Sequence, residues 1–387
     1  MSRVSSIFAQ FLQLFPRVQF QQAVEKHKAE RHARGFTCWG QFVAMMFCQL
    51  GAARSLREIC NGLAASEGKL KHLGIPIAPS RSTLSYANEH RPWELYQTVF
   101  GNLLERCHSI ATGKKKFRFK NKLVSLDSTT IDLCASVFDW AHYKRTKGAV
   151  KVHLLLDNEG YLPCFACITD GKKSDVAVGR TLHFQPGTIL VVDRTYIDYD
   201  WWKQMIEGGV YFVTGFKKDL KFETIAEREV PQNSNVLRDR DIRIAPYGKD
   251  YALHLRLVTI WHEEKQEEIT FLTNHLKFGA TTIARIYKER WQIELFFKAL
   301  KQLLRVKTFV GTSANALKTQ IWTALIAILL LKYLQLRSQY GWSLSNLVAL
   351  VRQQLFVYRD LYVWLDDPFI APPVLTGMHD GQLALGF

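Results

Sequence analysis

Residues 188–193, TILVVD, set the architecture expected for this chain, because they are almost entirely apolar up to the acid that closes them. A strand with one solvated face alternates apolar and polar residues, whereas a strand covered on both faces is apolar throughout. We therefore expect residues 188–193 to lie at the centre of a sheet with helices on both faces. The acid, Asp193, then stands at the carboxyl end of a central strand, where open α/β sheets hold their ligands.

Around this strand the pattern alternates between short strands and short helices. Residues 123–127, LVSLD, predict a second apolar strand that ends in an acid, Asp127. An Asp after a strand often only forms a turn, whereas two carboxylates at strand ends can also bind a metal ion. Both interpretations stay open at this level. The other elements expected here are strands at 150–156, 161–168 and 210–214 and helices at 175–182 and 199–207.

The next part of the chain, residues 216–277, is more polar and alternates as antiparallel strands do, for example at 253–260 and 269–272. It predicts a β-rich insertion. Three helices are expected to follow, at 282–305, 321–334 and 344–361.

The first part of the chain is helical by its periodicity, from residue 4 to about residue 106. One short helix is expected at 55–65, and after the turn GIPIAP a second is expected at 80–88. The exposed side of the second helix offers hydroxyls, Asn and Arg81, groups that contact phosphates and base edges. Either a helix-turn-helix-like DNA-binding unit or an ordinary surface helix fits this pattern.

The formal charge of +16 favours a polyanionic partner, because nucleic acids release counterions when Lys and Arg neutralise their phosphates. Residues 1–120 hold 18 Lys and Arg against 7 Asp and Glu, so +11 of the surplus lies there. Much of it is the run KKKFRFK at residues 114–120, which is either a solvated linker or a nucleic-acid contact. A membrane surface or a ribosomal-type role is the alternative for the whole chain.

The seven Cys form no framework of spacings, and Cys164 and Cys167 lie in an apolar run expected to be a strand, not a metal or redox site. The first fifteen or so residues carry no signal-peptide pattern. The longest apolar stretch, residues 321–331, is too short to span a bilayer. We therefore expect a cytoplasmic protein with reduced thiols and no membrane partner.

The helix expected at 282–305 carries a stripe of charge. At about 100° per residue, one narrow face holds Glu294 with a phenol and four cations. These are Tyr287, Arg290, Lys298, Lys301 and Arg305. The opposite side holds residues expected to pack on the sheet: Leu295, Phe296, Ala299, Leu300 and Leu303. The stripe is either a solvated face with i,i+4 pairs such as Arg290 to Glu294, or a lone acid bridged through metal to an anionic substrate.

The spacing Tyr287-x2-Arg290-x3-Glu294-x6-Lys301 resembles the YREK signature of the insertion-sequence-four family of bacterial DDE transposases. Residues 126–130, LDSTT, and 192–196, VDRTY, are similar to the blocks that carry the family's two Asp, and residues 148–153 to the strand after the first block. The resemblance covers about residues 120–335. The region before it resembles the helical domain of unknown function that precedes such cores.

The resemblance implies an α/β fold, with an RNase-H-like catalytic core interrupted by a β-rich insertion and preceded by an all-α N-terminal DNA-binding domain. It further implies that Asp127, Asp193 and Glu294 are catalytic and hold two Mg²⁺ ions, for which Mn²⁺ can substitute. The expected parts are a helical domain with a basic linker (1–120), the core (121–215 and 279–335), the insertion (216–278) and a C-terminal helical region (336–387).

The charged residues and the resemblance together predict where DNA is bound. The expected contacts on the charged stripe are Tyr287, Arg290, Lys298, Lys301 and Arg305. Arg81 is expected to bind DNA from the N-terminal domain. Trp261, which lies in the insertion, either stacks on a flipped base, as in some members of the family, or packs across strands.

The function expected is that of a transposase, which cuts and rejoins double-stranded DNA by two-metal-ion chemistry. Its partners are then the inverted repeats of its element and target DNA, bound as a homodimer in the bacterial cytoplasm in association with the nucleoid. One alternative is a related RNase-H-like nuclease that cuts without joining. Another is a non-catalytic DNA-binding protein derived from a transposase, and a basic RNA-associated protein is a third.

Overall fold

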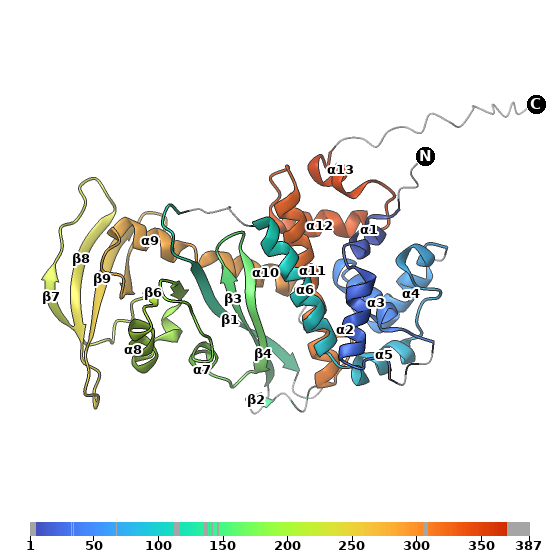
Figure 1. The fold of residues 1–387 in the computed structure, drawn as a ribbon, viewed down its shortest axis with the longest axis horizontal. Helices are drawn as coiled ribbons and strands as arrows, with labels where there is room; N and C mark the ends of the chain where they lie inside the picture. The colour runs from blue at the N-terminus through green and yellow to red at the C-terminus, as the bar shows by residue number, and fades with distance from the viewer. Residues whose placement is uncertain are drawn as a thin grey trace, which may run out of the picture.

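The computed structural model has a sheet-containing part and a helical part that lie side by side (Figure 1). It describes residues 5–31, 33, 35–66, 68–111, 117–134, 138, 140, 142–144, 147–304 and 309–369. In Figure 1 the sheet occupies the left and centre of the molecule, and helices from both ends of the chain gather on the right. One helix, α10 (Trp291–Leu304), runs between the two parts.

Five strands form the central part of the sheet in the order β4-β3-β1-β5-β6. β1, β5 and β6 are parallel, whereas β3 is antiparallel to β1 and β4 is antiparallel to β3. This is the RNase-H-like arrangement of strands, as expected. The bounds are β1 (Leu123–Cys134), β3 (Lys147–Asp157), β4 (Leu162–Asp170), β5 (Ile189–Val192) and β6 (Tyr211–Gly215), and a short β2 (His142–Lys144) pairs with β3.

The prediction that β5 is covered on both faces is confirmed. Leu190 and Val192 belong to a core cluster under α7 (Asp175–Gly179), η2 (Arg194–Tyr196) and α8 (Tyr199–Glu207). Ile189 and Val191 belong to a second cluster on the other face, under α9 (Ala280–Lys288). All four side chains are fully buried, so the apolar run is explained by two packed faces.

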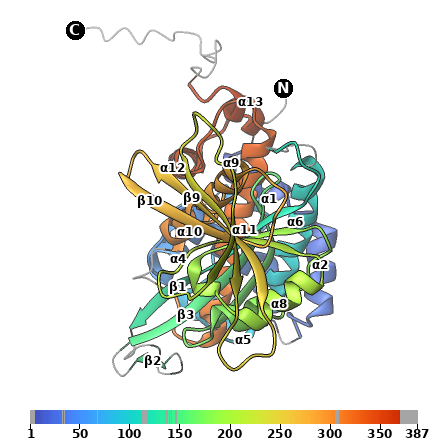
Figure 2. The same ribbon diagram turned by 90° about the vertical axis from the view of Figure 1, so that its left-hand side faces the viewer.

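The β-rich insertion is confirmed, and its strands continue the central sheet. β10 (Glu267–Thr273) pairs with β6, and β9 (Leu253–His262), β8 (Val236–Ile244) and β7 (Glu223–Glu227) follow in antiparallel order. Figure 2, which faces this end of the molecule, shows these strands fanned by the sheet twist. A buried pair, Arg256 with Asp239 at 2.6 Å, ties β9 to β8.

The helical part is built around one apolar helix, α11 (Ala314–Arg337), which packs against α3, α5, α6, α10 and α12. α11 is long and apolar enough to cross a membrane, but all its residues from 319 to 331 are buried inside the molecule. The other helices are α1 (Ile7–Gln13), α2 (Arg17–Lys26), α3 (Cys38–Leu50), α4 (Leu56–Ala64), η1 (Leu70–Leu73), α5 (Arg81–His90), α6 (Glu94–Ala111), α12 (Leu344–Gln354) and α13 (Leu361–Asp366).

Helices from before and after the sheet share one core in this part of the molecule. The amide of Ile7 donates to the carbonyl of Val357 at 3.0 Å, and Gln10 bonds both the Arg359 carbonyl and the Leu361 amide. The helix expected at 344–361 ends earlier, as α12 at Gln354, and α13 begins only at Leu361, after the segment that bonds to α1. The domain boundaries drawn from the sequence stay predictions.

The two short helices expected near residues 55 and 80 are confirmed as α4 and α5. Ser55 and Ser80 cap them, since their hydroxyls accept hydrogen bonds from the amides of Glu58 and Thr83. Asn88, expected on the exposed side of α5, is buried instead, and its side-chain Oδ1 accepts a hydrogen bond from the amide of the Gln41 side chain. The exposed side of α5 therefore offers Arg81 and hydroxyls but not this amide.

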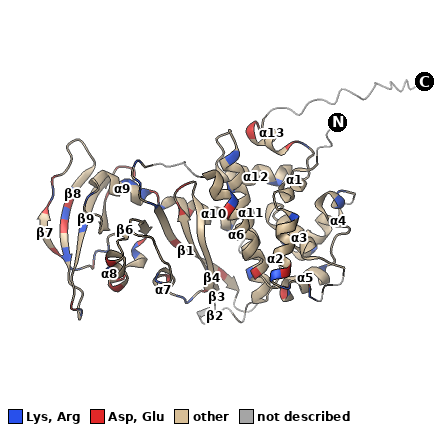
Figure 3. Ribbon diagram, viewed as in Figure 1, with Lys and Arg blue, Asp and Glu red and all other residues tan. Residues whose placement is uncertain are grey.

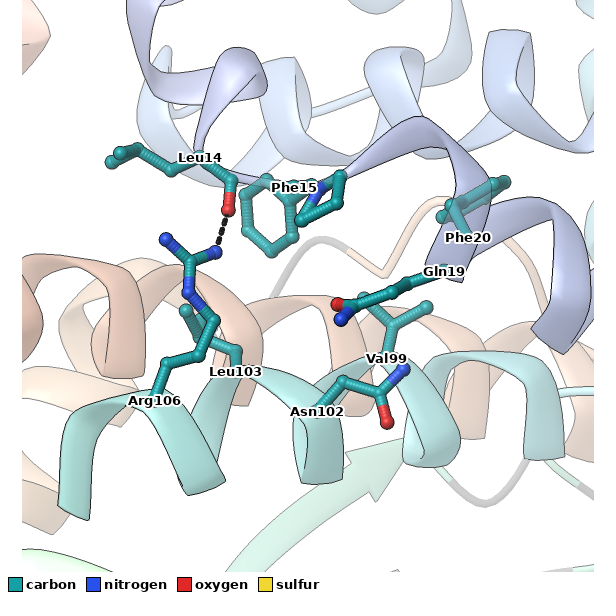
Figure 4. A pocket seen from close by; sticks show the side chains of 9 residues that line it. Leu14, Phe15, Gln19, Phe20, Val99, Asn102, Leu103 and Arg106 are labelled. Carbon is teal, nitrogen blue, oxygen red and sulfur yellow. Dashed lines mark hydrogen bonds between the residues drawn. The ribbon is translucent and has the colours of Figure 1, made fainter. Parts of the chain in front are cut away.

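A hollow lies where the corner between α1 and α2 crosses α6 (Figure 4). Arg106 reaches from α6 to the carbonyl of Leu14 at its edge, while Gln19 and Asn102 face it from the two sides. Its volume of about 20 Å³ is that of little more than one water molecule. This hollow is therefore a packing gap and not a ligand site.

Candidate active site

Asp127 lies in the middle of β1, not at its end as the sequence predicted. β1 pairs with β5 only from Leu123 to Ser125, because β5 stops at Val192. Its pairing with β3 continues to Cys134, so the strand runs on past the acid. Asp127 thus occupies the place on β1 where the neighbouring strand has ended and the sheet opens.

Asp193 follows the last residue of β5 and caps the short helix η2. Its Oδ1 accepts hydrogen bonds from the amide and the hydroxyl of Thr195, the first at 2.8 Å. Its carbonyl accepts from the hydroxyl of Thr214 on β6, at 3.0 Å. Asp193 is therefore held at the carboxyl end of the central strands, as predicted.

The helix expected at 282–305 is broken. α9 ends at Lys288 and α10 begins at Trp291, and at the break Arg290 bonds the carbonyl three residues back, that of Tyr287, at 3.0 Å. Angles counted along one straight helix therefore do not relate Tyr287 to Glu294. The ring of Tyr287 instead packs on Phe271 of β10, with 4.8 Å between ring centroids.

The side of α10 expected to pack inward is only partly as predicted. Phe296, Ala299 and Leu300 are buried, but Leu295 is 41% exposed. The side chain of Leu303 lies outside the described residues. α10 packs between β1 and the bundle formed around α11, so its buried face is set by helices as well as by the sheet.

Arg290 joins the helix to the sheet at the site. Its Nη2 lies 2.7 Å from Oε1 of Glu294, and its Nη1 lies 3.6 Å from Oδ2 of Asp127. Arg290 also lies 5.5 Å from the ring centroid of Tyr287. One guanidinium thus sits between two of the three expected catalytic acids and against the expected phenol.

The charge of the third acid, Asp193, also acts on Asp127. Burial, with smaller effects from the negative charges of Asp193 and Glu294, raises the pKa of Asp127 to about 7. The Ser128 amide, which donates to Asp127 at 2.8 Å, and the Arg290 guanidinium act in the opposite direction. The three carboxylates therefore carry more negative charge than Arg290 balances. Binding of a further cation would stabilise them in their ionised form.

The donor set suits a hard divalent ion, because all three acids offer carboxylate oxygens. Within the part of the chain that the structure describes, however, no three His, Cys, Asp or Glu side chains lie close enough together to hold a metal ion. Arg290 occupies the space between Asp127 and Glu294. A metal ion and this guanidinium therefore compete for the same oxygens.

Comparison with known proteins identifies the family of this chain. Residues 118–330, more than half of the chain, match the family described as Transposase DDE domain. The chain belongs to the DDE transposase family. Residues 3–76 match a domain of unknown function, DUF4372.

Similar proteins carry transposase names. A Sinorhizobium fredii protein named as transposase y4zB is 30% identical over 81% of this chain and 88% of its own. A protein of Geobacillus stearothermophilus, named as a transposase for insertion sequence element IS5377, is 29% identical over 70% of this chain and 72% of its own. The cryo-EM structure of a piggyBac transposase synaptic complex with hairpin DNA is 9% identical, with a TM-score of 0.43 over 95% of this chain and 80% of that one; this likeness is too low to carry an argument. Membership in the family means that this transposase acts on DNA and depends on a divalent metal.

A group of side chains behind Asp127 was not singled out from the sequence. The carboxylate of Asp175, the first residue of α7, accepts hydrogen bonds from Ser128 at 2.7 Å and from Lys151 at 3.1 Å. The fully buried His153 lies 3.6 Å from the same oxygen. Because the amide of Ser128 also holds Asp127, these residues support the transposase's first acid from the opposite face of β1. The sequence did contain a signal for this group, because residues 148–153, which include Lys151 and His153, are similar to a block of the family.

The transposase exposes an aromatic residue beside Glu294 that the sequence analysis did not single out. Trp291, the first residue of α10, is 57% exposed. Lys298 and Lys301 are exposed further along the same helix, and Arg305 lies outside the described residues. The signal for it in the sequence was an aromatic residue three positions before Glu294.

The two remaining expected DNA contacts lie elsewhere. Trp261 is on β9 in the insertion, 36% exposed and opposite Glu268 of β10. Arg81 is exposed at the start of α5, in the helical part. In Figure 3, Lys and Arg mark α9, on which Arg285 and Lys288 are exposed, and also β8.

Proposed function

We propose that Asp127, Asp193 and Glu294 are the catalytic carboxylates with which this transposase cuts DNA at insertion-sequence ends and joins the freed ends to target DNA. The observation that carries the proposal is the contact of one guanidinium, Arg290, with both Asp127 and Glu294. It is supported by the effect of Asp193 on the pKa of Asp127.

We further propose that the divalent ions are two Mg²⁺, for which Mn²⁺ can substitute. Such ions supply a Lewis acid for the leaving oxygen and an activated nucleophile. We assign Asp127 to both ions, because the charges of Asp193 and Glu294 both act on its pKa. Asp193 is held by Thr195 and Glu294 by Arg290, so both carboxylates are oriented before substrate arrives.

The positive groups of the site have a different role, which is to bind phosphates. Arg290 offers a bidentate guanidinium, which suits a phosphate as well as a carboxylate. Lys298 and Lys301 are exposed on the same helix and reach solvent beside it. Trp291 presents a flat apolar face there, suited to stacking on a base. Tyr287 is packed against Phe271, so we assign it to holding Arg290 as well as to contacting DNA.

We also propose DNA contacts away from the three acids. Arg81 and the hydroxyls of α5 would bind element-end DNA, and Trp261 would contact DNA from the insertion. Arg305, which lies outside the described residues, would add a further phosphate contact. Double-stranded DNA with inverted repeats at two ends favours a homodimer, one protomer for each end. A protein of this charge would associate with the nucleoid through its DNA.

The test is cleavage of labelled end DNA by a Glu294→Gln variant. Gln keeps the shape of Glu but not its charge. Losing a residue that only orients a metal ligand typically costs up to about a hundredfold in activity, so losing a ligand itself is expected to lower cleavage by more than that. DNA affinity is expected to survive, because a negative charge near phosphates is removed.

The matched control is Glu207→Gln on α8. Glu207 pairs with Lys203 four residues earlier at 3.8 Å, as Glu294 pairs with Arg290, but on an exposed surface. It is expected to cut at the wild-type rate. Cleavage by Glu294→Gln near the wild-type rate would refute the site. Cut ends that never join to target DNA would instead favour the nuclease without strand transfer.

A further inference from the structure

The break between α9 and α10 has no cause in the local sequence. Residues 288–291 read Lys-Glu-Arg-Trp, with no Gly or Pro and with good helix formers in three of four places. Sharp helix breaks have identifiable causes, and where propensity does not supply one, a tertiary contact must. The cause therefore has to be sought in what these residues touch.

Glu289 lies in the break and is only 4% exposed. Its low exposure places this acid inside the molecule, between the buried Ile286 and Ile293 in the sequence. A buried carboxylate is unfavourable unless it is hydrogen-bonded. Its Oε2 accepts a hydrogen bond of 2.6 Å from the hydroxyl of Tyr161.

Tyr161 belongs to the turn that joins β3 to β4 and is fixed there. Its φ of 54° is left-handed, an uncommon backbone for a tyrosine and one that a firmly held turn imposes. The same turn is bonded to β1, since the amide of Asn158 donates to the carbonyl of Leu123 at 3.0 Å. Burial and the carboxylate of Glu289 raise the pKa of Tyr161, so its hydroxyl stays a donor.

We propose that Tyr161 and Glu289 form a tether that holds the α9–α10 break in place and thereby positions Arg290 and Glu294 against Asp127. The tether ties the break to the β3–β4 turn, and this turn is tied to β1. The next residue after Glu289 is Arg290, whose guanidinium meets both acids. Both residues of the tether are positioning residues, because neither contacts the reacting groups. The proposal rests on the proposed catalytic role of Glu294.

The test compares cleavage with DNA affinity in Tyr161→Phe, which removes one hydroxyl and keeps the ring. Single-turnover cleavage at saturating protein is expected to fall about tenfold to a hundredfold, the usual worth of a hydrogen bond to a charged group. DNA affinity is expected to change less than about twofold, because no phosphate contact is lost. A merely structural role would lower both in proportion to folded protein.

The matched control is Tyr251→Phe. Tyr251 donates to Asp200 at 2.6 Å, the same chemistry and length as the tether, but between the insertion and α8. It is expected to cut at the wild-type rate. Glu289→Gln keeps an acceptor oxygen and is expected to lose less cleavage than Glu289→Leu, and adding Tyr161→Phe to Glu289→Leu is expected to cost nothing more.

Two outcomes decide the proposal. Wild-type cleavage by Tyr161→Phe, with Glu294→Gln inactive in the same assay, would overturn the tether and leave the active site standing. An active Glu294→Gln would overturn the proposed function itself. Should Glu289→Leu fail to fold, Tyr161→Phe and Glu289→Gln still decide the matter, because both keep the volume of the native side chain.

Discussion

Replacing Asp127 by Asn is expected to stabilise the free transposase at pH 8 while abolishing cleavage. Burial, with smaller effects from Asp193 and Glu294, raises the pKa of Asp127 to about 7, against an ordinary value of 3.8. A difference of about three pKa units corresponds to about 4 kcal/mol against the ionised carboxylate in the folded state. Asn keeps the shape, can still accept the Ser128 amide, and carries no charge. Arg290 keeps its contact with Glu294, so about 2–4 kcal/mol of stabilisation is expected.

The sign of the pH dependence follows from the two pKa values. Below about pH 4 the Asp127 carboxyl is protonated in both states, so it adds no penalty. Between about pH 4 and 7 the unfolded chain has released a proton that the folded chain retains, and the stability of the wild type falls as pH rises. Above about pH 7 both states are ionised and the penalty stays constant. The advantage of Asp127→Asn should therefore grow through this window and then level off.

The assay is urea unfolding of both proteins in EDTA at pH 5, 6, 7 and 8, with the free energy of unfolding compared at each pH. Asp200→Asn is the control, because hydrogen bonds from Tyr251 and Lys249 lower the pKa of Asp200 and its replacement should not stabilise. A free energy of unfolding that is equal for Asp127→Asn and the wild type at pH 8 would refute the reasoning. So would an advantage that shrinks from pH 5 to pH 8.

Three further predictions follow from the site. Cleavage should require Mg²⁺ or Mn²⁺ and stop in EDTA, while Ca²⁺ supports the protein–DNA complex but little cutting; rapid cleavage in chelator would contradict the carboxylate site. Ser128→Ala, which breaks the contact with Asp175, should slow cleavage about tenfold with DNA affinity kept, as measured against Ser109→Ala on the surface of α6. Trp291→Ala should weaken binding of end DNA about tenfold, if stacking contributes a typical amount per base, whereas Trp291→Phe should retain most of it; gel shifts measure both, and equal affinities of all three proteins would exclude the stacking.

The central sheet could be predicted from the sequence because burial on two faces leaves a direct mark. Residues 189–192 are apolar without exception, as a short strand covered on both faces requires. The end of β1 could not be predicted in the same way. Asp127 resembles the end of a strand, but β1 continues because β3 still pairs with it after β5 has stopped. The extent of a strand depends on its neighbours, and a single segment does not contain that information.

In the candidate site, too, one part could be predicted from the sequence and another could not. The identities of Asp127, Asp193 and Glu294 followed from a motif, whereas their placement depends on contacts between distant segments. The sequence predicted a straight helix through residues 282–305 because each residue in it tolerates a helix. The structure breaks this helix at Glu289, where a buried acid meets Tyr161, a residue 128 positions earlier. Local propensity amounts to tenths of a kcal/mol per residue, whereas a hydrogen bond to a charged group contributes about 1.5–3 kcal/mol. The tertiary contact therefore prevails, and the place where the helix prediction fails is the place where Arg290 is brought between Asp127 and Glu294.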